Sequence, residues 1–298
     1  MLYGLACSNE TKYMDLAFLE SLVNVVESGS IAEAARMQQL TGAAVRQRVA
    51  ALERELGVTL LTRAGHTCVP TQPCLSLLQR ARSLVHDGKL LREDLDATGL
   101  AGPLRIGAIS TVLTGLMPRV LHALAEQAPR VTPLLKPGGS AALYEAVLSG
   151  ELDAAVIVAP PFALPKSMAT AFLRREPLLF ITKQATGRTI KDQLSGERYI
   201  RYDAAAWGGR FAQQYLLAQG VQPQLFCNLD ALEAITLMVA AGVGVSLIPQ
   251  WIGFEELRAR VHSKVIAGKQ YQRELVLIAR RHVAQTERMR LLLSLLSK

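Results

Sequence analysis

The stretch "GSIAEAARMQQLTGAAVRQRVAALERELG", from Gly29 to Gly57, contains two helical patterns joined by a short turn. Ser30, with Glu33 three residues later, has the form of a capping box that opens the first helix, and Thr41 can cap the second. Along the second pattern runs an apolar stripe that consists of Val45, Val49, Leu52 and Leu56. Two short helices with small residues at their contact and a tight turn are typical of a helix-turn-helix.

The face opposite the apolar stripe combines small side chains with long hydrogen-bond donors. At about 100° per residue, this face contains Ala43, Gln47, Ala50 and Arg54, with Arg46 and Arg48 on its flanks. Small residues let a helix enter the major groove, while arginine can pair with guanine and glutamine with adenine. The pattern predicts a recognition helix; the alternative is an alanine-rich helix with a solvated basic face.

A small hairpin is predicted directly behind this helix. Residues 58–71, "VTLLTRAGHTCVPT", read as two extended runs around a turn. Such a wing can lie along the DNA backbone or the minor groove. We therefore expect a winged helix-turn-helix over residues 14–71. Its candidate DNA-binding residues are Thr41, Ala43, Arg46, Gln47, Arg48, Arg63 and His66.

Bulk charge does not locate this DNA-binding face. The formal net charge is +8, but residues 1–100 carry a net charge of −1 and residues 101–298 a net charge of +9. The DNA-binding prediction therefore depends on where individual arginines lie. Residues 1–13 are patternless and are expected to form a disordered extension. The longest apolar run, residues 234–249, is shorter than a membrane span of roughly 20 residues, so we expect a cytoplasmic protein.

Behind the hairpin the sequence changes twice. Residues 72–98 return to a helical pattern, which predicts a linker or dimerisation helix, an ordinary packed helix being the alternative. From residue 103 onward strands alternate with helices, which predicts a doubly wound α/β domain with largely parallel sheets. Asp230 and Glu233 have the spacing of a capping box for the helix that follows them.

Taken in order, these segments resemble a LysR-type transcriptional regulator over residues 14–298. The resemblance is carried by "MDLAFLESLVNVVESGSIAEAARMQQLTGAAVRQRVAALERELGVTLLTR", "GPLRIGAIS", "LSGELDAAV", "EPLLF" and "VAAGVGVSLIP". It implies a winged helix-turn-helix, a dimerising linker helix and a two-lobed α/β effector domain resembling periplasmic solute-binding proteins. It places lobe I at about 103–175 and 274–298 and lobe II at about 176–273. Homotetramers that bind promoter DNA and respond to a small co-inducer are implied as well.

The recognition helix departs from the usual pattern of this family. Gly42 and Ala43 replace the glutamine and proline that often meet DNA, and Arg46 replaces a serine. The base preference of relatives is therefore not carried over to this chain.

The two-lobed arrangement predicts an effector site between the lobes, where strands end and helices begin. Ser110 and Thr111 follow one strand, and Ser140 occupies a similar place after another. The resemblance marks these places and adds Arg201, Tyr202, Asp203 and Asn228 as effector contacts. Helix starts and Arg201 favour a small organic anion. Two alternatives stay open: Ser110 and Thr111 as helix caps, and Arg201 in a local ion pair with Asp203.

Other classes of protein fit less well. The five histidines are scattered, and "GVGVSL" at Gly242 follows a helix and precedes a strand, the reverse of a dinucleotide site, so we expect no enzyme, cofactor or metal. A solute-binding protein would explain residues 103–298 alone. Thiol-based redox sensing is a further alternative, but Cys227 is the only cysteine of the effector region, which excludes an internal disulfide there.

Overall fold

The computed structural model describes residues 14–65, 67–93 and 98–297. The chain forms two compact units, residues 1–95 and residues 96–298. The predicted extension at residues 1–13 lies outside the described residues. Within the described part, no helix has the length and apolar character needed to cross a membrane.

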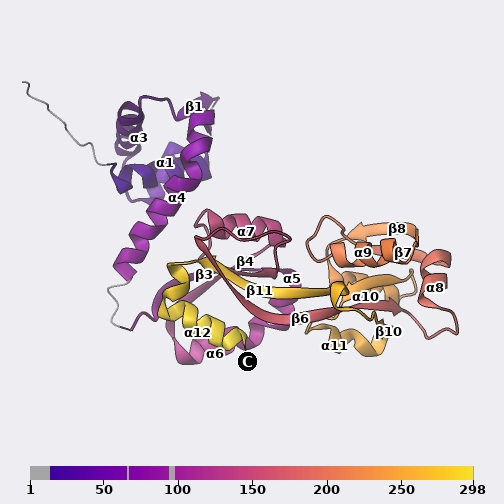
Figure 1. The fold of residues 1–298 in the computed structure, drawn as a ribbon. Coiled ribbons are helices and arrows are strands. Elements are labelled where there is room, and N and C mark those ends of the chain that lie inside the picture. The colour runs from indigo at the N-terminus through magenta and orange to yellow at the C-terminus, as the bar shows by residue number, and fades with distance from the viewer. Residues whose placement is uncertain (1–13, 66, 94–97, 298) are drawn as a thin grey trace, which may run out of the picture. The chain divides into compact units, whose positions relative to one another are not determined.

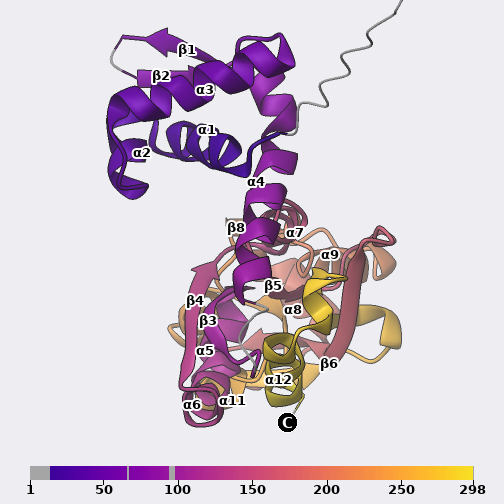
Figure 2. The same ribbon diagram turned by 90° about the vertical axis from the view of Figure 1, so that its left-hand side faces the viewer.

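The first unit contains the three helices and the hairpin that the sequence predicts (Figure 2). Its elements are α1 (Leu16–Ser28), α2 (Ile31–Met37), α3 (Gly42–Leu56), β1 (Leu61–Ala64), β2 (Thr67–Pro70) and α4 (Gln72–Glu93). The predicted stripe of α3 packs inward: Val45 lies against Val25 and Ala34, and Leu52 against a second cluster. The apolar periodicity of the sequence thus correctly predicted which face of α3 packs inward.

Short hydrogen bonds define where α3 and its neighbours begin. Thr41 Oγ1 accepts from the Ala44 N–H at 3.1 Å, which caps α3 as predicted. Ser30 Oγ accepts from the Glu33 N–H at 3.3 Å, whereas the Glu33 side chain pairs with Arg36. The predicted capping box of α2 is therefore formed in one direction only.

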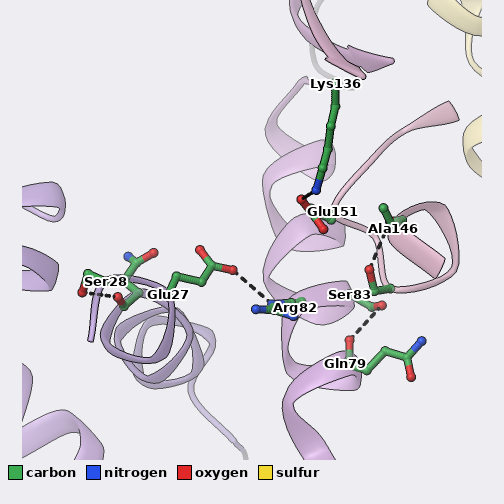
Figure 3. Close-up of polar contacts among 10 residues, drawn as sticks. Glu27, Ser28, Gln79, Arg82, Ser83, Lys136, Ala146 and Glu151 are labelled. Carbon is green, nitrogen blue, oxygen red and sulfur yellow. Dashed lines mark hydrogen bonds and ion pairs between the residues drawn. The ribbon is translucent and has the colours of Figure 1, made fainter. Parts of the chain in front are cut away.

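Glu53 fixes the hairpin to α3. Its Oε1 accepts from the N–H groups of Leu60 and Leu61 at 2.7 and 3.1 Å, where β1 begins. β1 and β2 are antiparallel, with Arg63 opposite Cys68. On the other side of the unit, Arg82 of α4 reaches Glu27 of α1 at 3.0 Å (Figure 3). Hairpin, α1 and α4 thus hold α3 in place.

The second unit consists of two α/β lobes joined by two long strands (Figure 1). Lobe I contains β3 (Ala101–Ala108), α5 (Ser110–Gly115), α6 (Met117–Gln127), β4 (Arg130–Pro137), α7 (Ser140–Leu148), β5 (Ala154–Val158) and α12 (Glu287–Leu296). Lobe II contains α8 (Ile190–Gly196), β7 (Arg198–Tyr202), α9 (Arg210–Ala218), β8 (Gln224–Leu229), α10 (Leu232–Ala240), β9 (Ser246–Pro249), α11 (Phe254–Leu257) and β10 (His262–Val265). The joining strands are β6 (Met168–Thr182) and β11 (Gln272–Arg280).

The prediction of largely parallel sheets is only partly correct. β3 is parallel to β4 and β5, and β7 is parallel to β8. All pairs that involve β6 or β11 are antiparallel, because these strands carry the chain between lobes in opposite directions. In lobe I, Lys136 of β4 also pairs with Glu151 behind α7 (Figure 3). The alternation of strands and helices along the sequence could not reveal that β6 and β11 run between the lobes in opposite directions.

The start of α10 corrects a second prediction. α10 begins at Leu232, and its N-cap is Ala231, which makes no side-chain capping bond. Asp230 and Glu233 therefore do not form the expected capping box. The carboxylate of Asp230 lies instead at the wall of a cavity.

Candidate DNA-binding surface and effector cavity

The predicted DNA-contacting residues of α3 divide into two groups in the structure. Ala43, Arg46 and Gln47 are exposed. Arg48 turns back: its guanidinium donates to Ser21 Oγ and Gln38 Oε1, both at 3.4 Å. Arg48 thus ties α3 to α1 and to the turn after α2, and it is suited to holding the helix in position.

A groove lies between α3 and the hairpin. Arg46 of α3 and Arg63 of β1 both line it, together with Ala50 and Thr62. The two cations come from different elements that Glu53 connects, so their spacing is fixed by the fold. His66 lies outside the described residues.

Between the two lobes of the second unit lies a cavity of about 210 Å³. Its walls come from the ends of β3, β4, β5 and β7, from the starts of α5, α7 and α10, and from β11. The polar side chains in these walls are Ser110, Thr111, Ser140, Tyr202, Trp207, Asp230 and Arg273. Ligand sites of α/β folds commonly lie at such carboxyl ends of strands.

Four of the sequence-predicted effector residues line this cavity: Ser110, Thr111, Ser140 and Tyr202. α5 begins at Ser110 itself, with Ile109 as an N-cap that makes no side-chain bond. Ser110 and Thr111 therefore do not cap this helix. Ser140 Oγ accepts from the Val158 N–H at 3.2 Å, which joins the start of α7 to the end of β5.

Arg201, Asp203 and Asn228 are absent from the cavity lining. Arg201 Nε donates to Asn228 Oδ1 at 2.9 Å, across the β7/β8 pair in which the two residues are directly opposite. Asp203 Oδ1 accepts from the Ala205 N–H at 3.0 Å. Because successive side chains of a strand point to opposite faces, Tyr202 faces the cavity and Arg201 faces away from it.

The cavity contains a buried cation that sequence reasoning missed. Arg273, at the start of β11, is 1% exposed, and its Nε donates to Glu176 Oε2 at 2.6 Å. Its other nitrogens donate to Tyr202 Oη at 3.4 Å and to Thr111 Oγ1 at 3.1 Å. Burial opposes the charge of Arg273, but Glu176 and Tyr202 outweigh it and raise the pKa of the guanidinium.

The hydrogen bonds of Arg273 connect the two lobes. Thr111 belongs to lobe I and Tyr202 to lobe II, while Arg273 and Glu176 are directly opposite each other on the joining strands. The available signal was that charged residues directly precede two apolar runs: Glu176 stands before "PLLFI", and Arg273 and Glu274 stand before "LVLIA". Buried charges are generally paired, but sequence alone did not indicate which residues would meet.

Asp230 is the second missed residue. Burial and the nearby Asp203 raise the pKa of Asp230, whereas Arg273 and the Tyr202 hydroxyl lower it. Burial raises the pKa of Tyr202 to about 12, so the tyrosine keeps its proton near neutral pH. The Tyr202 hydroxyl thus accepts a hydrogen bond from Arg273 at 3.4 Å and also lies near the carboxyl group of Asp230.

Trp207 supplies an aromatic wall. Its ring lies edge-on to Phe162 at a centroid distance of 5.6 Å and tilted against Tyr144 at 6.1 Å. Tyr144 and Phe162 belong to lobe I, whereas Trp207 belongs to lobe II. These contacts close one side of the cavity across the two lobes.

Two glycines after Trp207 make this wall possible. A Cβ on Gly208 would lie 2.4 Å from Tyr202 Oη, and one on Gly209 would lie 1.9 Å from the Asp203 carbonyl oxygen. The chain here approaches Tyr202 so closely that only glycine fits.

Gly208→Ala is expected to displace the Tyr202 hydroxyl and to weaken ligand binding in the cavity by about 10-fold or more, because one hydrogen bond to a charged group is lost. Gly187→Ala is the matched control, because its Cβ meets no atom within 4 Å. Fluorescence of Trp207 during ligand titration measures the difference. Equal affinities of the two variants would contradict this account of the wall.

Comparison with known proteins agrees with both units. The family "LysR substrate binding domain" matches residues 97–298, and the family "Bacterial regulatory helix-turn-helix protein, lysR family" matches residues 16–74. A hydrogen peroxide-inducible genes activator of Dickeya chrysanthemi is 28% identical over 247 residues, or 79% of each chain. The transcriptional activator IlvY of Salmonella typhimurium is 27% identical over 246 residues, covering 80% of this chain and 83% of its own.

A solved structure shows the same fold. A full-length variant of OxyR from Pseudomonas aeruginosa superposes with a TM-score of 0.73 at 22% identity, covering 96% of this chain and 95% of its own. The family matches extend over both units and over most of the chain. The chain therefore belongs to the LysR-type transcriptional regulators, DNA-binding proteins whose second domain binds an effector.

Proposed function

We propose that this regulator contacts promoter DNA through the exposed face of α3 and the hairpin, and that a small organic anion in the inter-lobe cavity modulates its activity. The observation that carries the DNA contact is the groove shared by Arg46 and Arg63. Ala43 and Gln47 are the residues suited to meet base edges, and Thr41 and Arg48 hold the helix. His66 is assigned to the DNA backbone or the minor groove.

The cavity supports an anionic effector for two reasons. Gly139 caps α7 without a side-chain bond, so the first N–H groups of this helix are open to a negatively charged ligand at the cavity wall. Ser110 and Ser140 place hydroxyl groups in the same wall. The bound ligand would contact both lobes, which lets it change how they sit against each other.

The organisation of the regulator is proposed from α4 and the family. Residues 14–71 bind DNA, residues 72–98 dimerise, and residues 103–298 bind the effector. Leu75, Leu84 and Leu91 of α4 are 50%, 48% and 69% exposed, which supports a homodimer through this helix. A homotetramer in the cytoplasm without enzymatic activity completes the proposal.

The cysteines give thiol sensing little support. Cys227 is the only cysteine of residues 96–298. In the first unit, burial and then Glu53 raise the pKa of Cys74. A reactive thiol has a lowered pKa, so small-molecule binding is the better assignment.

Thermal unfolding in the presence of candidate carboxylic acids tests this function. An acid at 100 times its Kd stabilises the native state by about 2.7 kcal/mol, which raises the Tm by about 5–10 °C in a domain of this size. The same acid is expected to change the affinity of the protein for its promoter DNA. Stabilisation by neutral sugars or polyols and by no acid would contradict the proposal.

A further inference from the structure

The inter-lobe cavity contains an acidic group that a simple organic anion leaves without a partner. Asp230 lines the cavity and is open to solvent there. The neutral hydroxyl of Tyr202 lies near it and lowers its pKa. Among the described lysines, arginines and histidines, none forms an ion pair with it.

The nearby guanidinium forms no ion pair with Asp230 in the described part of the chain. Arg273 is buried and pairs with Glu176 at 2.6 Å, and it acts on Asp230 only by lowering the pKa of that carboxyl group. Asp203 lies close enough to raise the pKa of Asp230 further. The lobe II wall therefore presents a carboxylate that forms no ion pair in the described part of the chain, and a cationic group of a ligand is attracted to it.

The opposite wall has the reverse character. It is formed by the start of α7 with Gly138, Gly139 and Ser140, and by Ser110 at the start of α5. These groups offer N–H and O–H donors and no carboxylate. A group that can bind a cation thus lines the cavity from lobe II, and groups that can bind an anion line it from lobe I.

The size of the cavity limits what can bridge these walls. Its volume of about 210 Å³ is below the roughly 300–1,000 Å³ of sites for drug-sized ligands. A compact molecule with an ammonium and a carboxylate group close together fits both the volume and the charges.

We propose that the effector is a small amphoteric acid of the α-amino acid class, whose ammonium group binds Asp230 and whose carboxylate lies against the start of α7. This inference rests on the proposed function, because it assumes that an anionic effector occupies the cavity. Tyr202 is a positioning residue: its hydroxyl is held by Arg273 at 3.4 Å and lies near the Asp230 carboxylate.

Matched ligands test the proposal on the full-length protein. Each L-α-amino acid is compared with the carboxylic acid that lacks its amino group and with the amine that lacks its carboxylate. Trp207 fluorescence and the Tm give the affinities. We expect at least one amino acid to bind about 10-fold or more tightly than both of its counterparts, because each lost charged contact leaves a polar group of the cavity unpaired.

Asp230→Asn is nearly isosteric, and it tests the contact with the ammonium group of the ligand separately from the contact with its carboxylate. It should weaken binding of that amino acid by about 10-fold or more and leave binding of the deaminated acid nearly unchanged. Glu255→Gln, an exposed residue that pairs with Arg258, is the control for the loss of one negative charge and should change neither affinity.

The outcomes separate this inference from the proposed function. If no amino acid binds more tightly than its deaminated counterpart, the amphoteric ligand is refuted, whether or not Asp230→Asn folds. Binding of the deaminated acids would then still support an anionic effector. Binding of neutral compounds alone would refute both.

Discussion

Glu176→Leu is expected to lower the free energy of unfolding of the effector unit by about 3–5 kcal/mol. The substitution leaves the guanidinium of Arg273 fully buried, with only the hydroxyls of Tyr202 and Thr111 as partners. An uncompensated buried charge is among the few changes that cause so large a loss. Urea unfolding of the full-length protein, followed by tryptophan fluorescence, measures it, because Trp207 and Trp251 both lie in this unit.

Two further variants identify the cause. Glu176→Gln keeps an acceptor for Arg273 and is expected to lose less. The double variant Glu176→Leu/Arg273→Met removes both charges from the junction of β6 and β11 and should recover most of the lost stability. If the double variant is as unstable as Glu176→Leu alone, packing rather than charge accounts for the effect. Arg174 also lies 3.4 Å from Glu176 and loses this partner in both Glu176→Leu variants, so its contribution cancels when the two variants are compared.

Arg46→Ala/Arg63→Ala is expected to weaken promoter binding by about 100-fold at moderate salt, because a base contact in the major groove is worth about 1–3 kcal/mol and a phosphate contact adds to it. It should also reduce the slope of log affinity against log salt concentration by about 1, because one phosphate contact is lost. Gel-shift or fluorescence titrations at several salt concentrations provide both quantities.

The control for this variant is Arg258→Ala. Arg258 is exposed and pairs with Glu255 in the effector unit, so its loss removes a positive charge without touching α3 or the hairpin. We expect the salt slope of Arg258→Ala to equal that of the unaltered protein. If Arg46→Ala/Arg63→Ala binds the promoter with unchanged affinity and unchanged salt slope, the proposed DNA-binding face is refuted.

The DNA-binding unit was the most predictable part of this chain. Caps, turns and helical periodicity depend on residues a few positions apart, and Thr41, the stripe of α3 and the hairpin all followed from them. What the pattern could not show is that Arg48 turns back to Ser21 and Gln38. Its position on the flank of α3 fits a DNA contact equally well until α1 is packed beside it.

The inter-lobe cavity was predictable only in outline. The ends of strands and starts of helices indicated Ser110, Thr111 and Ser140, and the family resemblance added Tyr202; all four line the cavity, from both lobes. Arg201 and Asn228 instead pair with each other, since strand alternation directs them away from Tyr202. Asp230, expected to cap α10, lines the cavity because α10 begins two residues later.

The sequence by itself determined the helix-turn-helix, the hairpin behind it and the family of the protein, because these depend on local hydrogen bonds, periodicity and the order of segments. Tertiary structure decided the charges of the cavity. Arg273 and Glu176 are 97 residues apart, and only the antiparallel register of β6 and β11 makes them partners. Burial then makes their pairing obligatory, whereas Asp230 lies at the wall of the cavity.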